Sequence, residues 1–400
     1  MPNTGITPPR GIALLLAALS ALGPFSIDTY LPSFHDIGQS LHATPLEVQQ
    51  TLTAYLLPFA IMALWHGAIS DALGRRRVLL VTLALFGVAQ FGCLFATRIE
   101  HLWILRALQG ITAGAGIVVG RAIVRDLFDG PAAHRLMSHI TMMFALAPAI
   151  APVIGGRLQL WFGWRSIFAF LVVATLALWV ACWRLLPETL PTERRQALHA
   201  GYLARTYWKV LSSPAFLFAC GGLAFNFAGF FIYVMSAPEF LMRHLGLPET
   251  AFFWLFGPAM AGLMSGSWVS GRLAGKLTMR QTVVRGYLVM GLAALGNISL
   301  NLWFPPSLPW SVIPILVYTF GMSIAMPCLT LMALDPFPEQ RGLVASCQMF
   351  LQAGANSLVA GVLAPLLWGS TRTLSFGMGV LMLLGALSAG MHHRRTRQST

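Results

Sequence analysis

The feature that most constrains this chain is a series of long apolar runs that recurs along its length. About 20 consecutive apolar residues are enough for an α-helix to cross the hydrocarbon core of a bilayer. The runs are continuous rather than alternating, which favours helices over the strands of a membrane barrel. We predict twelve membrane spans, at 11–34, 48–69, 78–97, 102–124, 136–159, 165–186, 214–237, 250–273, 282–304, 310–333, 342–367 and 373–391.

The charged residues agree with a membrane protein and suggest its orientation. Only 10% of the residues are charged, whereas soluble domains average about 25%. The net charge of +13 does not indicate nucleic-acid binding, because the basic residues are concentrated in loops on one side. If the N-terminus is cytoplasmic, 20 of the 26 lysines and arginines lie on the cytoplasmic side. This positive-inside bias predicts that both termini are cytoplasmic.

The longest polar interval separates the sixth predicted span from the seventh. We therefore predict an N-terminal six-helix half at 1–186, a cytoplasmic linker at 187–213 and a C-terminal six-helix half at 214–400. The two halves show weak internal similarity, since "DTYLPSF" in the first span can be aligned with "VMSAPEF" in the seventh. Repeated halves are common among transporters.

No pattern in the sequence indicates catalysis. The five cysteines are scattered through the spans without CxxC spacing, and the histidines show no metal-ligand spacing. The chain has no G-x4-G-K-[ST] motif, so we do not expect ATP to drive it. We predict that the protein is not an enzyme and that it uses no metal and no cofactor.

The loop after the second predicted span reads "GAISDALGRRR", with the spacing G-x3-D-x2-G-R-R. Gly67 and Gly74 would permit a tight reversal between adjacent helices, and Asp71 can cap or face a helix N-terminus. Arg75 and Arg76 would hold the cytoplasmic face by attraction to anionic lipid. The spacing resembles the loop 2–3 signature of the major facilitator superfamily, in which these five residues would form part of a cytoplasmic gate.

Two further stretches resemble the same superfamily. "RALQG" in the fourth predicted span is similar to the R-x-x-Q-G element of its proton-coupled drug antiporters. "APAIAPVIGG" in the fifth resembles the antiporter motif, although alanine replaces the first two glycines of that motif. Pro148, Pro152, Gly155 and Gly156 would let this helix bend and pack closely during gating. The alternative is a bent packing helix with no role in coupling.

A finer resemblance is to the Bcr/CflA multidrug efflux branch. It rests on "PFSIDTYLPS", "GRAIVRDLFDG", "GWRSIFAF", "FNFAGFFIYVMSAPEF" and "ALDPFPEQRGLVASCQMFLQ", which together extend over nearly the whole chain. The resemblance implies an all-α polytopic protein with the major facilitator fold, located in the bacterial inner membrane. It also implies proton-driven export of small drugs of the bicyclomycin, chloramphenicol, florfenicol or sulfonamide type, and we expect a monomer.

Two ionisable residues lie deep within the predicted spans. Asp28 is about 9 Å from the outer end of the first span, and Arg106 is about 6 Å from the outer end of the antiparallel fourth span. Each charge would cost about 2.5–3.5 kcal/mol at a bilayer centre. Their similar depth allows an ion pair or coupling through water, and we predict that they couple proton movement to transport. A purely structural pair is the alternative. Pro32 marks the expected outer end of this helix.

Similar antiporters often carry a second acid about two turns before the first, where this chain has the neutral Ser20. We therefore place the membrane-embedded coupling on Asp28 alone and expect neutral or zwitterionic substrates. Polar residues at helical spacing inside the spans should point inward and are our candidates for substrate binding. They are Tyr30, Gln109, Asn226, Tyr233, Gln348 and Gln352. Gln109 also lies three residues after Arg106 on the same helix face, where we expect it to be able to bond Arg106.

A second reading of these features remains open. The same fold can serve a proton-coupled importer or facilitator of a small metabolite. The single acid and the partial antiporter motif favour export. Drug-dependent proton release would support export, and substrate-driven proton uptake would support import.

Overall fold

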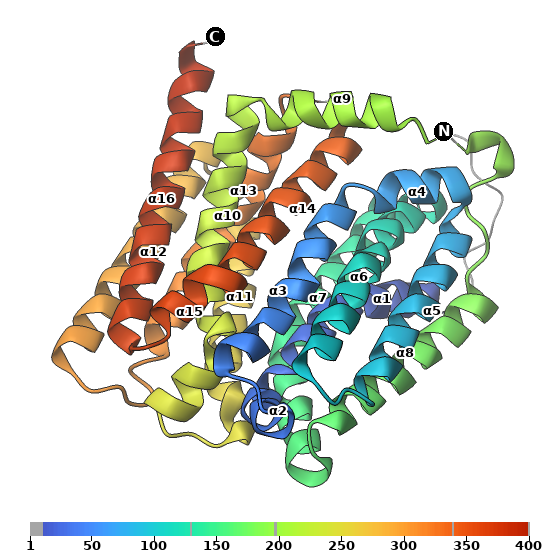
Figure 1. Cartoon of the computed structure of the whole chain (residues 1–400). Helices are drawn as coiled ribbons and strands as arrows, with labels where there is room; N and C mark the ends of the chain where they lie inside the picture. The colour runs from blue at the N-terminus through green and yellow to red at the C-terminus, as the bar shows by residue number, and fades with distance from the viewer. Residues whose placement is uncertain (1–10, 129, 196–197, 338–339, 399–400) are drawn as a thin grey trace. The chain divides into compact units, whose positions relative to one another are not determined.

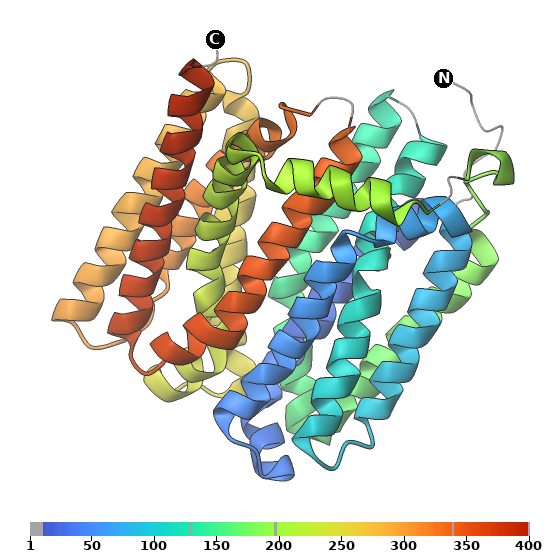
Figure 2. The ribbon, with the colours of Figure 1, turned by 45° about the horizontal axis from the view of Figure 1, so that its top comes forward.

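The computed structural model describes residues 11–128, 130–195, 198–337 and 340–398. Within these ranges the chain is almost entirely helical, with one isolated β-bridge between Ala274 and Leu277 and no named strand. Its contacts divide it into two compact units, Met1–Ala200 and Gly201–Thr400, and the boundary falls inside the interval 187–213. Figures 1 and 2 show the helices from two directions.

The first unit packs its helices side by side, with α3 against α6, α1 against α6 and α7, and α5 against α6 and α8 (Figure 1). α6 therefore contacts much of this unit. The elements are α1 (Ile12–Asp28), η1 (Leu31–Ser33), α2 (Phe34–Leu41), α3 (Pro45–Ala63), α4 (His66–Leu73), α5 (Arg75–Cys93), α6 (Ile99–Leu127), α7 (Gly130–Phe162), α8 (Arg165–Leu185) and η2 (Thr192–Arg194).

The second unit is built in the same way, with α10 against α16, and α13 against α11 and α12. α12 also packs on α16. The elements are α9 (Ala200–Leu211), α10 (Pro214–Met235), η3 (Glu239–His244), η4 (Glu249–Phe252), α11 (Phe253–Leu273), α12 (Met279–Trp303), α13 (Ile313–Leu334), α14 (Arg341–Leu358), η6 (Val359–Leu363), α15 (Ala364–Leu367) and α16 (Thr371–Gln398).

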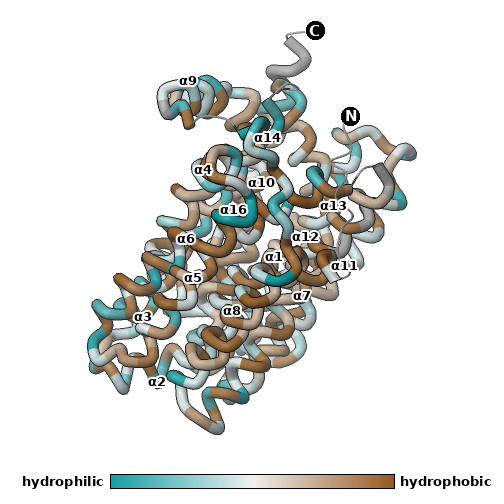
Figure 3. The backbone as a smooth tube through the Cα atoms, turned by 90° about the vertical axis from the view of Figure 1, so that its right-hand side faces the viewer, coloured by the Kyte–Doolittle hydropathy of each residue, from teal (hydrophilic) through white to brown (hydrophobic). Residues whose placement is uncertain are grey.

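Each of the twelve predicted spans falls on one or more helices. In the described part of the chain, nine helices are long and apolar enough to cross a membrane, or ten if α3 and α4, which bend by 55° at a break, form one span. α7 and α11 do not meet this criterion, so a membrane crossing by either of these two helices stays a prediction. Figure 3 shows hydrophobic residues along the middle of most helices.

The first span differs from its prediction. We expected the helix to end near Pro32, but α1 already ends at Asp28, and the chain continues through η1 and α2 to Leu41. Proline lacks the N–H that would bond the carbonyl four residues earlier, here that of Asp28. The proline therefore acts on the turn before it, and Asp28 occupies a helix C-terminus rather than a helix interior.

Two glycines allow helices of the first unit to approach closely. A Cβ atom at Gly110 of α6 would overlap the backbone carbonyl oxygen of Tyr55 in α3. A Cβ atom at Gly155 of α7 would overlap the carbonyl oxygen of Thr29, the residue after α1. Small residues at helix contacts permit this backbone-to-backbone packing in membranes.

We predict that Gly110→Ala destabilises the protein, although alanine is normally better in a helix by about 0.5–1 kcal/mol. The added methyl group must push α3 away from α6. Gly120→Ala in the same helix is the matched control, because the nearest atoms to its Cβ lie 3.9 Å away. Thermal unfolding of the detergent-purified protein measures the difference. A Gly110→Ala midpoint equal to or above that of Gly120→Ala would contradict the packing account.

Candidate functional site

A fully buried guanidinium lies where four segments of the first unit meet. Arg106 of α6 has no exposed surface. Its Cζ lies 4.2 Å from the ring centroid of Tyr30, 5.5 Å from that of Tyr55 and 5.7 Å from that of Phe168. These rings come from the turn after α1, from α3 and from α8. A desolvated cation over an aromatic face is stabilised by about 2 kcal/mol.

The same guanidinium is hydrogen-bonded to the end of α1. Both terminal nitrogens of Arg106 donate to the Ser26 carbonyl oxygen at 3.2 Å, and Nη1 also donates to Gln109 Oε1 at 2.9 Å. The Ser26 carbonyl is one of the last four of the helix, which lack a donor from the next turn. A cation at this place also interacts favourably with the negative end of the helix dipole.

Asp28 ends α1 two residues after Ser26 and is 5% exposed. The ion pair with Arg106 that its depth allowed is not formed. Across the described residues, the Asp28 carboxyl has no hydrogen-bond or ion-pair partner. Arg106 therefore binds the end of α1 that carries Asp28, but it does so through the Ser26 carbonyl and not through the Asp28 carboxyl.

Two of the residues predicted to bind substrate, Tyr30 and Gln109, lie next to Arg106 and make contacts within the protein, so a role in substrate binding stays a prediction for both. Tyr30 is fully buried, and its hydroxyl accepts a hydrogen bond from Thr51 at 3.2 Å. Gln109 holds Arg106 and donates to the sulfur of Cys93 at 3.3 Å. The spacing Arg106–Gln109 correctly predicted their contact.

The antiporter-like stretch contacts the same region. α7 continues as one helix through Pro148 and Pro152. Gly155 of this helix packs on Thr29, immediately after Asp28, and Gly156 is also buried. α7 therefore fixes the backbone next to the unpaired carboxyl.

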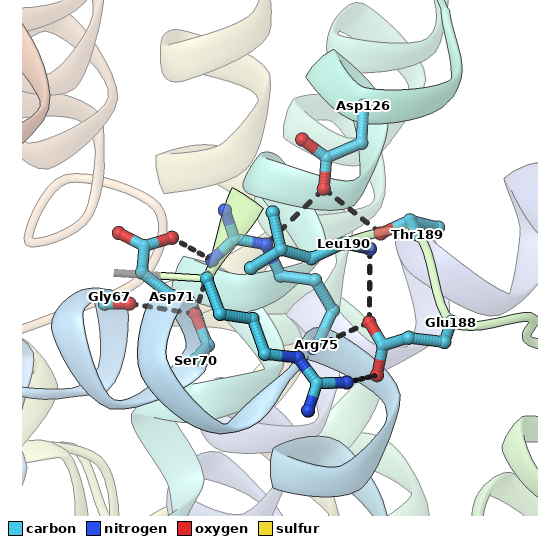
Figure 4. A network of polar contacts seen from close by, with 9 residues as sticks. Gly67, Ser70, Asp71, Arg75, Asp126, Glu188, Thr189 and Leu190 are labelled. Atoms are coloured by element: carbon cyan, nitrogen blue, oxygen red, sulfur yellow. Dashed lines mark hydrogen bonds and ion pairs between the residues drawn. The ribbon is translucent and has the colours of Figure 1, made fainter. Parts of the chain in front are cut away.

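A second polar site surrounds Arg75 at the junction of α4 and α5 (Figure 4). Its guanidinium pairs with Asp71, lies 3.3 Å from Asp126 and donates to Ser70 Oγ at 2.5 Å. Its backbone N–H donates to Glu188 Oε1 at 2.9 Å. Only 8% of Arg75 is exposed, and its guanidinium charge is compensated by carboxylates from the end of α4 and the end of α6, whereas the segment after α8 binds its backbone N–H.

Three expectations for this loop were wrong. Arg75 is buried and paired with Asp71 and Asp126, so it does not act by attraction to anionic lipid. Asp71 does not cap a helix N-terminus; Glu188 accepts the first N–H of α5, and Asp71 pairs with the Arg75 side chain.

Gly74 does make the turn, with φ of 98°, a conformation that favours glycine. Gly67, in contrast, lies within the first turn of α4, and a Cβ there would meet its nearest atom at 3.7 Å, so the turn does not require glycine at 67. Arg76 donates to the Trp183 carbonyl oxygen at 2.6 Å.

Sequence reasoning missed four residues of this network: Ser70, Asp126, Glu188 and Thr189. Thr189 donates to Asp126 Oδ2 at 2.9 Å, which links the segment after α8 to α6. Glu188 also lies 4.0 Å from Arg195. The sequence carries a signal for two of them. Asp126 in "RDLFDG" and Glu188 in "PETL" are acids on the predicted cytoplasmic side, where most charged residues are basic.

The predicted binding residues of the second unit lie in separate polar contacts. The Tyr233 hydroxyl accepts from Asn297 Nδ2 at 2.7 Å, and the Asn226 carbonyl accepts from Tyr318 at 3.0 Å. Gln348 lies 3.5 Å from Thr330 Oγ1, and Gln352 lies 3.4 Å from Asn356 Oδ1. Asn226 and Tyr233 are buried, whereas the two glutamines are half-buried. A role in substrate binding stays a prediction for all four residues.

The sequence profile of the Major Facilitator Superfamily matches residues 14–360. The chain belongs to the Major Facilitator Superfamily. The predicted superfamily and its helical fold are therefore confirmed, and members of this family are transporters rather than enzymes.

Individual members of the superfamily are similar over nearly the whole chain. An uncharacterized MFS-type transporter YdgK of Bacillus subtilis is 32% identical over 94% of this chain and 92% of its own length. A bicyclomycin resistance protein homolog of Haemophilus influenzae is 26% identical, with 94% of each chain covered. The structure of the xylose transporter XylE from E. coli shares the fold, with a TM-score of 0.73 at 14% identity, covering 96% of this chain and 97% of that chain.

We predict that Arg75→Lys lowers the thermal stability of this superfamily member. A lysine ammonium is a compact point charge and cannot satisfy Ser70, Asp71 and Asp126 together as the planar guanidinium does. The lysine keeps the positive charge, so the expected loss is that of a hydrogen bond to a charged group, about 1.5–3 kcal/mol. Arg77→Lys is the control, because Arg77 is exposed in the same helix. Equal unfolding midpoints for the two variants would show that the Arg75 network contributes little.

Proposed function

We propose that the chain exports small drugs across the bacterial inner membrane in exchange for protons, by alternating access of its two halves. The proposal rests on the carboxyl of Asp28, which is buried at the end of α1 and has no partner in the described part of the chain. An ionisable group inside a membrane span is costly and usually functional. The relative named for bicyclomycin resistance supports a drug as the transported molecule.

The proposed coupling uses the position of Asp28 next to the Arg106 site. With its proton bound, the Asp28 carboxyl is neutral, and Arg106 remains on the Ser26 carbonyl and the rings. When the proton leaves, the new carboxylate competes for the guanidinium, which is bound to the carbonyl two residues before Asp28. A shift of Arg106 toward Asp28 would break its bonds to Ser26 and change how α1 meets α6. Proton release would thereby be linked to a conformational change.

The energetics permit such an exchange. One charge crossing 100 mV of membrane potential provides about 2.3 kcal/mol. This corresponds to a concentration ratio of nearly 50-fold for a neutral solute, since 1.4 kcal/mol is a factor of ten. One carboxyl can therefore drive export of a neutral drug.

We propose neutral or zwitterionic drugs, of the bicyclomycin or amphenicol kind, as substrates. The place two turns before Asp28 holds Ser20, which is buried and bonds its own helix at Leu16 O, 3.0 Å away. The described part of α1 therefore offers one carboxyl, and that carboxyl is assigned to the proton. A cationic drug would have to be compensated elsewhere.

Asp28→Asn should abolish drug-dependent proton movement. The amide has nearly the same shape but cannot exchange a proton at physiological pH. Drug added to energised inside-out vesicles should collapse the proton gradient when the wild-type protein is present and leave it unchanged with the variant. Drug binding to the purified variant should stay within a few-fold of wild type.

The matched control is Glu100→Gln, which removes an exposed carboxyl from the first turn of α6. It should transport like the wild type. Full proton-coupled transport by Asp28→Asn would exclude this carboxyl as the coupling group. Substrate-driven proton uptake by the wild-type protein would instead support the alternative function, an importer of a small metabolite.

Asp71→Asn tests the proposed cytoplasmic gate. The amide loses the ion pair with Arg75 while Asp126 and Ser70 remain. We expect turnover to fall about tenfold, equivalent to 1.4 kcal/mol on the barrier, with drug affinity nearly unchanged. Transport rates and equilibrium binding on the same preparation separate the two quantities. A loss of affinity at unchanged turnover would contradict a gating role.

A further inference from the structure

The second unit carries a groove that no part of the proposed transport cycle uses. It lies between α12, α13 and α16 and has a volume of about 700 Å³. Its apolar wall includes Leu288, Leu292 and Leu295 of α12, which are 62, 71 and 64% exposed. In a helix that spans a membrane, such exposed leucines face lipid.

Small residues create the hollow. α16 contributes Ala386, Ala389 and Gly390 to its lining, and α12 contributes Gly291. A Cβ at Gly390 would meet no atom within 4 Å, so the space beside it is open. A larger side chain at this position would fill the groove without disturbing the packing behind it.

One end of the groove is basic. Arg280, near the start of α12, and Arg394, near the end of α16, both line it, together with His393. The two helices pack on each other and run antiparallel, which brings their charged ends together. Neither arginine has an ion-pair partner among the residues that the structure describes. Two guanidinium groups that face one hollow favour a phosphate group.

The length of the groove fits a lipid chain. From Arg280 to Leu295 the α12 axis rises about 22 Å. The hydrocarbon core of a bilayer is about 30 Å thick, so one leaflet measures about 15 Å. The apolar part therefore extends from the basic end across about one leaflet.

We propose that this groove binds an anionic phospholipid, with its phosphate between Arg280 and Arg394 and an acyl chain along the leucines of α12. Charge complementarity distinguishes this lipid from the zwitterionic lipids of the same membrane. An arginine near an anionic surface contributes enough for a several-fold preference, and two such groups act together here. The site is separate from Asp28, so the inference does not depend on proton coupling.

Native mass spectrometry of the full chain, released from nanodiscs that hold equal phosphatidylglycerol and phosphatidylcholine, tests the proposal. We expect phosphatidylglycerol to remain bound to the wild-type protein in about tenfold excess over phosphatidylcholine. The double variant Arg280→Gln/Arg394→Gln should lose this preference. Arg285→Gln/Arg341→Gln removes two exposed arginines of the same half that do not line the groove, and it should retain the preference.

Gly390→Leu tests the apolar part, because it fills the groove and leaves both arginines in place. It should reduce retention of phosphatidylglycerol as strongly as the double variant. Added glycerol phosphate, which has the headgroup charge but no chain, should not compete. Equal retention of both lipids by the wild type would overturn the proposal. So would equal losses in the two double variants, since these would indicate surface charge in general.

Discussion

The packing of the first unit depends on one buried cation, the Arg106 guanidinium, whose charge is compensated by aromatic rings and carbonyl groups rather than by an acid. Arg106 lies at full burial among Tyr30, Tyr55 and Phe168, and it binds the Ser26 carbonyl at the end of α1. This arrangement joins elements that are far apart in the sequence. It also leaves Asp28 unpaired in the described structure, although Arg106 binds the carbonyl two residues before it. A carboxyl in that position can change its charge without first breaking an ion pair.

The rest of the unit holds this helix end in place. Pro32 ends the regular helix at Asp28, and Gly155 brings α7 against the next residue. At the other polar site, Arg75 connects the α4–α5 junction to the end of α6. α6 carries both Arg106 and Asp126, separated by 20 residues or about 30 Å of helix. A movement of α6 relative to α1 would therefore affect both sites. Proton coupling at the Arg106 site and gating at the Arg75 site would then be linked through one helix.

The sequence predicted the helices because apolar length alone decides them, and it predicted the Arg106–Gln109 contact because both residues lie one turn apart on one helix. It did not predict the α1 break at Asp28, since the effect of a proline on the preceding turn depends on local geometry. The Arg75 network was also missed in part. Glu188 and Asp126 reach it from segments more than 50 residues away, and no helical spacing reports such a contact. The motif spacing does not reveal that Gly67 lies inside α4 rather than in the turn, because a motif gives the order of residues and not the point at which the helix begins.

The central claim is that the Asp28 carboxyl holds a proton in the drug-free protein and releases it when a drug binds. Infrared difference spectroscopy of the reconstituted protein measures this directly, through the carbonyl stretching band of a protonated carboxyl. We predict that adding drug to the wild-type protein removes such a band, and that Asp28→Asn lacks this difference signal while still binding drug. An unchanged carboxyl spectrum in the wild type, or the same loss of signal in the variant, would contradict the account.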